Sequence, residues 1–197
     1  MAGTPFDLQL LNACAALLLL LSFSMLSQRR IVSLVNLLAL QGGLLFIATL
    51  LLAWRTGQSH LYLSAALTLL LKVILLPWLL HRMIRRLEVY WDTEPLLNTA
   101  GTMLAGVVTV VFAFGLAQPI AALASTAMRN AIGIALAVIL LAFITMITRR
   151  KAMSQVVGFL SMENGLFFGA MSATDGMPMI VELGVALDVL VAMLVLG

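Results

Sequence analysis

The sequence predicts an all-α integral membrane protein, and three observations support this fold class. Hydrophobic residues make up 63% of the chain and charged residues only 10%, whereas soluble domains are about 45–50% apolar and about 25% charged. Apolar runs recur along the chain, each near the length of about 20 residues that a helix needs to cross a bilayer. Little sequence is left between these runs. The composition therefore excludes a soluble catalytic domain and a nucleotide-binding fold.

About seven transmembrane helices account for nearly the whole chain. The expected spans are 8–27, 31–54, 60–80, 98–117, 131–147, 152–172 and 178–196. Asp7 rather than a basic cluster precedes the first span, so we expect a retained helix and not a cleaved signal. Gln118 and Pro119 are expected to end the fourth span. Residues 175–178 are expected to form a turn, in which Pro178 suits the first position of the seventh helix.

The distribution of basic residues predicts the orientation in the membrane. With seven helices, only Arg55 and Arg129 fall on one side, and eight basic residues fall on the other. These eight are Arg29, Arg30, Arg82, Arg85, Arg86, Arg149, Arg150 and Lys151. Because the cytoplasmic side of membrane proteins carries the excess of Lys and Arg, the N-terminus is expected outside and the C-terminus in the cytoplasm.

The chain is expected to form one transmembrane domain with two related halves. The first half is 1–80, a cytoplasmic loop or interfacial helix covers 81–97, the fourth helix and its connection cover 98–127, and the second half is 128–197. Segment 38–48 aligns with 160–170, which places Gln41 on Glu163. Since the two copies lie four helices apart, helices one to three and five to seven would form a parallel repeat.

Four ionisable side chains lie inside the apolar runs, namely Lys72, Glu163, Glu182 and Asp188. A charge near the bilayer centre costs about 2.5–3.5 kcal/mol on insertion scales. Four of them together indicate ion pairing, a water-filled path or a change of protonation state. We therefore interpret the chain as one that handles ions or protons within the membrane.

Glu163 lies near the middle of the expected helix 152–172, which suits a carboxyl group that takes up and releases a proton. The alternative is a carboxylate that only hydrogen-bonds a neighbouring helix. Glu182 and Asp188 are six residues apart and would point about 120° from each other and lie about 9 Å apart along the helix axis. They would form successive steps of a path, or one would face a partner subunit. One functional and one structural acid is the alternative.

Lys72 is too deep to reach an interface, so it is expected to meet a carboxylate. Asp188 is the candidate if the repeat pairs helices three and seven, and a carboxylate on a partner chain is the competitor. A purely structural ion pair remains open. Pro77 is expected to open the backbone hydrogen bonding near Lys72. Gln41 and Asn164 are expected as supporting polar groups, with Gln41 bonding between helices.

The remaining features predict packing rather than chemistry. Gly165 and Gly169 have the spacing of close helix packing. A single cysteine, Cys14, excludes an internal disulfide, and without a Cys/His cluster no iron–sulfur cluster, other metal or cofactor is expected within this chain.

Several short motifs, in this order, resemble the hydrogenase-4 component E family of membrane subunits. They are Lys72-Val73 with Pro77, Gly158, Met162-Glu163-Asn164-Gly165, and Val181-Glu182 with Gly184, Ala186 and Asp188. The C-terminal third also resembles the small K-type subunit of respiratory complex I and of Mrp-type antiporters, through Arg149-Arg150, Gly158 and Asn164. Of the two membrane glutamates of K-type subunits, the second matches Glu182. The first falls on Leu160, and this chain carries Glu163 instead.

The resemblance implies a membrane subunit of a complex I-like, energy-converting [NiFe] hydrogenase or formate hydrogenlyase, in the cytoplasmic membrane of a bacterium. Such a subunit is not catalytic alone. The [NiFe] centre and iron–sulfur clusters are expected in partner subunits, and the partners are antiporter-like membrane subunits and a peripheral hydrogenase arm, with no nucleic acid. Glu163, Glu182, Asp188 and Lys72 would take part in proton translocation. An Mrp-type Na⁺/H⁺ antiporter subunit and a non-conducting scaffold are the alternatives.

Overall fold

The computed structural model describes residues 5–88, 90, 98–121, 126–174 and 184, and all regular secondary structure in them is helical, as predicted. The helices are α1 (Pro5–Ser27), α2 (Ile31–Thr56), α3 (Ser59–Thr68), the π-helix η1 (Leu69–Leu75), α4 (Leu76–Leu87), α5 (Thr99–Ala121), α6 (Thr126–Thr148) and α7 (Ala152–Thr174). Because α3, η1 and α4 are continuous, they form one rod. The described part of the chain thus has six helices that are long and apolar enough to span a membrane. Apart from Gly184, the expected span 178–196 lies outside the described residues.

Two helices continue past the ends that the sequence predicted. The rod extends through Arg82, Arg85 and Arg86 to Leu87, because Ile84 stays buried while the arginines face outward and favour the C-terminal end of a helix. Pro119 does not end α5, which continues to Ala121. A proline in a last turn removes only one hydrogen bond, so the helix tolerates it there.

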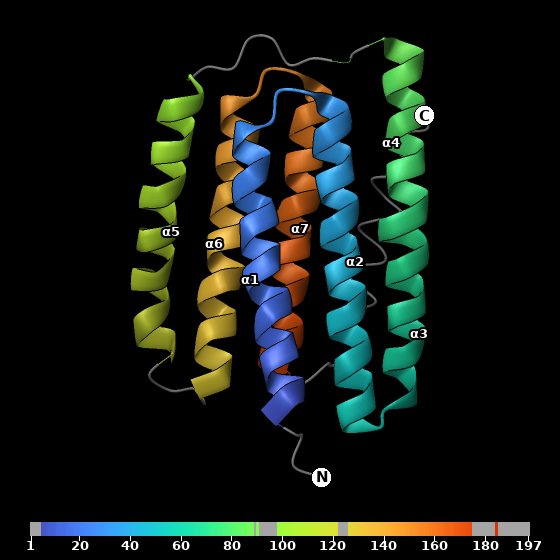
Figure 1. The fold of residues 1–197 in the computed structure, drawn as a ribbon, viewed down its shortest axis with the longest axis vertical. Coiled ribbons are helices and arrows are strands. Elements are labelled where there is room, and N and C mark those ends of the chain that lie inside the picture. Colours follow the sequence, from blue (N-terminus) through green and yellow to red (C-terminus); the bar gives the residue numbers. More distant parts are fainter. Residues whose placement is uncertain (1–4, 89, 91–97, 122–125, 175–183, 185–197) are drawn as a thin grey trace.

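The helices stand side by side along one direction (Figure 1). α5 packs against α6 and α1 at one edge, and the rod packs against α2 at the other. Between these edges, α1 packs on α6 and α2 packs on α7, and each of these pairs runs in the same direction. This is the orientation that a parallel repeat requires. The third pair of the repeat involves the span 178–196 and lies outside the described residues.

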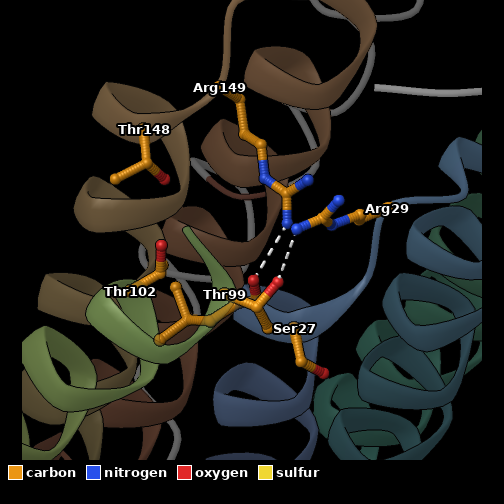
Figure 2. A pocket seen from close by; sticks show the side chains of 7 residues that line it. Ser27, Arg29, Thr99, Thr102, Thr148 and Arg149 are labelled. Atoms are coloured by element: carbon orange, nitrogen blue, oxygen red, sulfur yellow. Dashed lines mark hydrogen bonds between the residues drawn. The ribbon is translucent and has the colours of Figure 1, made fainter. Parts of the chain in front are cut away.

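The connections that carry the basic residues meet at one end of the bundle, which we call the basic end. Arg29 Nη2 donates a hydrogen bond to Thr99 Oγ1 over 2.9 Å. Arg149, although buried, donates from Nη2 to the carbonyl oxygens of Leu26 at 3.0 Å and Met25 at 3.3 Å. Figure 2 shows both guanidinium groups at the start of α5. These bonds tie the α1–α2 turn to α5 and to the α6–α7 turn.

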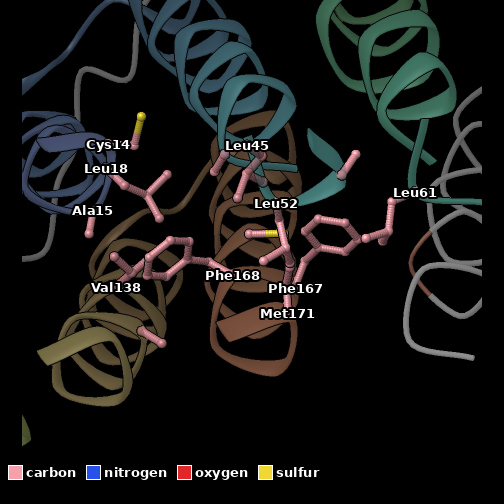
Figure 3. Packing of buried hydrophobic residues seen from close by; sticks show 13 residues of the cluster. Cys14, Ala15, Leu18, Leu45, Leu52, Leu61, Val138, Phe167, Phe168 and Met171 are labelled. Carbon is pink, nitrogen blue, oxygen red and sulfur yellow. The ribbon is translucent and has the colours of Figure 1, made fainter. Parts of the chain in front are cut away.

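Two hydrophobic clusters fill the bundle, and a polar layer lies between them. The cluster towards the basic end consists of Met25, Ile31, Leu34, Val35, Leu38, Leu76, Leu79, Leu80, Ile84, Met153, Val157 and Leu160. The cluster towards the far end is shown in Figure 3 and includes Leu18, Leu45, Leu52, Val138, Phe167, Phe168 and Met171. Gly165 and Gly169 allow α6 close to α7, since a Cβ on Gly169 would lie 2.8 Å from Ala135 Cβ. The predicted close packing at these glycines is confirmed.

Candidate functional site

A buried ion pair joins the rod to α7 in the middle of the bundle. Lys72 Nζ lies 2.7 Å from Glu163 Oε1. Lys72 is 5% exposed and Glu163 2% exposed. Glu163 is the twelfth of the 23 residues of α7, and Lys72 is the fourteenth of the 29 residues of the rod. Both charges therefore lie at mid-depth, where neither side chain can reach an interface.

The ion pair continues into a chain of hydrogen bonds that crosses to α1. Lys72 Nζ also donates to Asn164 Oδ1 at 3.0 Å. Asn164 Nδ2 donates to Gln41 Oε1 at 3.4 Å, and Gln41 Nε2 donates to Ser22 Oγ at 2.7 Å. Ser22 in turn donates to the carbonyl of Leu18. These side chains are buried and come from four helices, so the chain of hydrogen bonds links η1, α7, α2 and α1 in the interior of the bundle.

The backbone around Lys72 is adapted to this position. Lys72 lies in η1, whose wider hydrogen bonding precedes Pro77, a residue that cannot donate to the helix ladder. The predicted disturbance of the backbone near Lys72 is thereby confirmed. On α2, a Cβ atom on Gly42 would lie 2.9 Å from Lys72 Cβ and 3.2 Å from the Lys72 carbonyl oxygen. Gly42 is therefore the residue that lets α2 approach the backbone of η1 directly.

Glu163 has two carboxylate oxygens in different surroundings. Oε1 accepts from Lys72, whereas Oε2 is buried and has no hydrogen-bond partner among the described groups. Phe167 lies one turn further along α7, and its ring centre is 5.8 Å from Lys72 Nζ. Gly184 is buried beside both, because a Cβ on it would lie 3.7 Å from Glu163 Oε1 and 3.2 Å from Phe167 Cδ2. The pair thus sits in a tightly packed, largely apolar enclosure.

The structure tests part of what the sequence predicted for these residues. Lys72 does meet a carboxylate, but the one described is Glu163, a pairing that the sequence argument did not consider. The expected partner Asp188 lies outside the described residues, as does Glu182. Gln41 bonds between helices as predicted, and Asn164 supports the site by contacting Lys72.

Sequence reasoning missed Ser22. A serine in an apolar helix usually bonds back to its own backbone, and Ser22 does so here while also accepting from Gln41. No signal in the sequence separates it from Ser24, which bonds only within α1. Its role depends on which residue of α2 lies opposite.

The chemistry open to this arrangement is proton exchange. The polar groups of the site are the Lys72 ammonium, the Glu163 carboxylate, the side-chain amides of Asn164 and Gln41, and the Ser22 hydroxyl. In the described part of the chain, no cluster of three or more His, Cys, Asp or Glu side chains could hold a metal ion. Amine and carboxyl groups can both exchange protons, and Lys72 Nζ and Glu163 Oε1 lie within direct hydrogen-bond distance of each other.

Comparison with known proteins identifies relatives of this chain. It is 37% identical over its whole length to the uncharacterized protein Rv0085 of Mycobacterium tuberculosis, of which it covers 90%. It is also 27% identical to hydrogenase-4 component E of Escherichia coli K12, over 77% of this chain and 66% of that protein, and the same holds for the Shigella flexneri protein of that name. No family model and no solved structure matches the chain. The similarity to hydrogenase-4 component E includes most of the helical bundle but is distant.

Proposed function

We propose that this chain, which belongs to the same family as Rv0085 of Mycobacterium tuberculosis, is a membrane subunit of a complex I-like, energy-converting hydrogenase. The observation that carries the proposal is the Lys72–Glu163 pair at mid-depth, in a chain similar to hydrogenase-4 component E. In this role the chain catalyses no bond chemistry itself. It contributes buried ionisable groups to proton translocation that electron transfer in partner subunits drives.

The pair supplies a site where a proton can be held in the middle of the membrane. With Lys72 charged and Glu163 ionised, the pair is neutral and its mutual attraction offsets part of the cost of burial. A proton that moves from Nζ to Oε1 leaves a neutral amine and a neutral acid. A proton that arrives at Oε2, the oxygen without a described partner, would give the pair a net positive charge. Conformational changes in the complex would then favour uptake or release.

Asn164 and Gln41 would act as positioning residues in this mechanism. Asn164 fixes the ammonium group beside Oε1, and Gln41 fixes Asn164. Glu182 and Asp188 would be the next groups of the path. Glu182 and Asp188 themselves lie outside the described residues, and their part in the path is inferred from the sequence alone.

The proposal extends to the partners and the orientation. Antiporter-like membrane subunits would continue the proton path, and a peripheral hydrogenase arm would hold the [NiFe] centre and the iron–sulfur clusters. The basic end would face the cytoplasm of a bacterium, with the N-terminus outside, because eight Lys and Arg residues lie in the connections and the last turns of α4 assigned to that side.

The test uses the complex isolated through a tag on this chain and reconstituted into liposomes. We expect Glu163→Gln to lower proton translocation at least tenfold relative to electron flow, because an amide cannot carry the proton. Glu88→Gln is the matched control, since it makes the same substitution at an exposed residue at the end of α4 and should leave the ratio unchanged.

Subunit composition is measured in the same preparations, so that loss of assembly is not mistaken for loss of transport. Intact complexes in which both Glu163→Gln and Glu182→Gln pump like the wild type would contradict the relay and favour a scaffold. Nickel and iron in the purified complex would support the hydrogenase assignment. An assembly free of both that exchanges Na⁺ for protons would instead identify an antiporter subunit.

A further inference from the structure

The basic end contains a pocket into which two arginines point. Neither Lys72 nor Glu163 lines this pocket. The pocket is lined by Leu26, Ser27, Arg29, Thr99, Thr102, Thr148 and Arg149. Arg29 and Arg149 both reach it from turns that lie far apart in the sequence (Figure 2). Of these residues, Arg149 is only 4% exposed, whereas Arg29 is exposed.

The groups around the pocket suit an anion. Each guanidinium uses Nη2 for a bond within the protein, Arg29 to Thr99 Oγ1 and Arg149 to the last carbonyls of α1. The Thr99 hydroxyl accepts from Arg29, and a hydroxyl can also donate one hydrogen bond. Two guanidinium groups that face one pocket repel each other, and an oxyanion between them turns that repulsion into two charge-assisted interactions. The lining residues include no carboxylate.

The position of the pocket indicates which anion it would receive. It lies where α1 and α6 end and α5 begins, at the ends of three apolar spans, which is the depth of lipid headgroups. The enclosed space is about 10 Å³, about the volume that one water-sized group needs. One phosphate oxygen can therefore enter, while the rest of a headgroup stays at the exposed side near Arg29. Anionic lipids are recognised by basic pockets between helices in this way.

We propose that Arg29 and Arg149 form a binding site for the phosphate group of an anionic phospholipid at the basic end. The lipid tail would lie along the apolar surface of the bundle. The site is independent of proton transfer at Glu163. It would couple the stability of the α1–α2 and α6–α7 turns to the composition of the surrounding leaflet.

The test measures lipid binding to the full purified chain in detergent by native mass spectrometry. The probes are short-chain phosphatidylglycerol, a diacylglycerol of the same chain length that lacks phosphate, and inorganic phosphate. We expect the wild type to bind phosphatidylglycerol well above diacylglycerol, and Arg29→Gln to weaken that binding about tenfold. Arg55→Gln, the same substitution at the opposite end of α2, should bind like the wild type.

Arg149→Lys provides a second test, because it keeps the positive charge but replaces the planar guanidinium with a single ammonium nitrogen. This variant should also weaken binding. Equal binding of phosphatidylglycerol by the wild type and Arg29→Gln would overturn the proposal. Equal binding of diacylglycerol would do the same, because the phosphate would then contribute nothing. Inorganic phosphate that binds as well as the lipid would assign the pocket to a free anion. No binding of any probe would leave Arg149 as a helix cap or as a contact for an acidic partner segment, and would also reject the lipid site.

Discussion

Two regions of this molecule bury positive charge, and they stabilise it in different ways. At mid-depth, Lys72 is held by an opposite charge, Glu163, together with one carboxamide oxygen. At the basic end, Arg149 is as deeply buried but donates to the carbonyl oxygens at the C-terminal end of α1. Helix ends offer unpaired carbonyls and the negative end of the helix dipole, whereas the middle of a helix offers neither. Depth in the membrane thus determines which kind of partner a buried cation needs.

The largest effect should come from separating the mid-depth pair. Lys72→Met and Glu163→Leu should each lower the free energy of unfolding by about 3–5 kcal/mol, because each leaves one buried charge without its partner. The double variant should lose far less free energy of unfolding than the two single variants lose together. Reversible unfolding in mixed micelles measures this cycle. Additive losses would show that the two side chains are not coupled.

A steric test of the same region compares two adjacent glycines. Gly42→Leu should destabilise the bundle by about 3 kcal/mol, near the upper end for overpacking, because the new side chain meets the backbone of η1. Gly43→Leu is the control, since nothing lies within 4 Å of a Cβ at that position. Thermal unfolding in detergent distinguishes them. Equal destabilisation by both would show that the contact between α2 and η1 is not as close as described.

Substitution of the buried cation at the basic end should lower the free energy of unfolding by less. Arg149→Gln removes charge-assisted hydrogen bonds to two carbonyls and should lower stability by about 2 kcal/mol. Arg55→Gln, at an exposed position, should change it by less than about 0.5 kcal/mol. Unfolding midpoints of the two variants provide the measurement. A loss at Arg149 as large as that at Lys72 would remove the distinction between the two depths.

The smallest effect is expected at the α1 end of the polar layer. Ser22→Ala should cost about 1 kcal/mol, since it leaves Gln41 Nε2 without its acceptor. Ser24→Ala removes only a bond within α1 and should be close to neutral. Unfolding curves of the two variants, measured under the same conditions, test this difference. Equal stability of the two would mean that the contact between Ser22 and Gln41 contributes nothing.

The sequence was sufficient to predict burial and depth, but not pairing. Lys72 and Glu163 stood out because each interrupts an apolar run, and their positions in those runs gave their depth. The choice of Glu163 as the partner depends on α7 packing beside η1, and the sequence contains no measure of which helices are neighbours. Asp188 was preferred through the repeat, which relates helices but does not determine which side chains meet.

Helix ends were missed for a local physical reason. The end of an apolar run indicates where the membrane-spanning part of a helix ends, not where the helix itself ends. α4 continues beyond that point as an amphipathic helix, with Ile84 buried and its arginines facing outward. Arg149 was interpreted as a topology signal and as part of a family resemblance. Its capping of α1 was missed, because a contact between residues more than a hundred positions apart cannot be read from spacing. The internal repeat stays a prediction: the α1/α6 and α2/α7 pairs have the direction that it requires, and its third pair lies outside the described residues.

The long separation between Lys72 and Glu163 has a consequence for biosynthesis. The ribosome completes Lys72 91 residues before Glu163, so the lysine enters the membrane before its carboxylate exists. Until α7 is inserted, the third span carries a charge whose burial costs about 2.5–3.5 kcal/mol on insertion scales. The first half of the protein must therefore wait, close to water or to the insertion machinery, until the second half supplies its counter-ion.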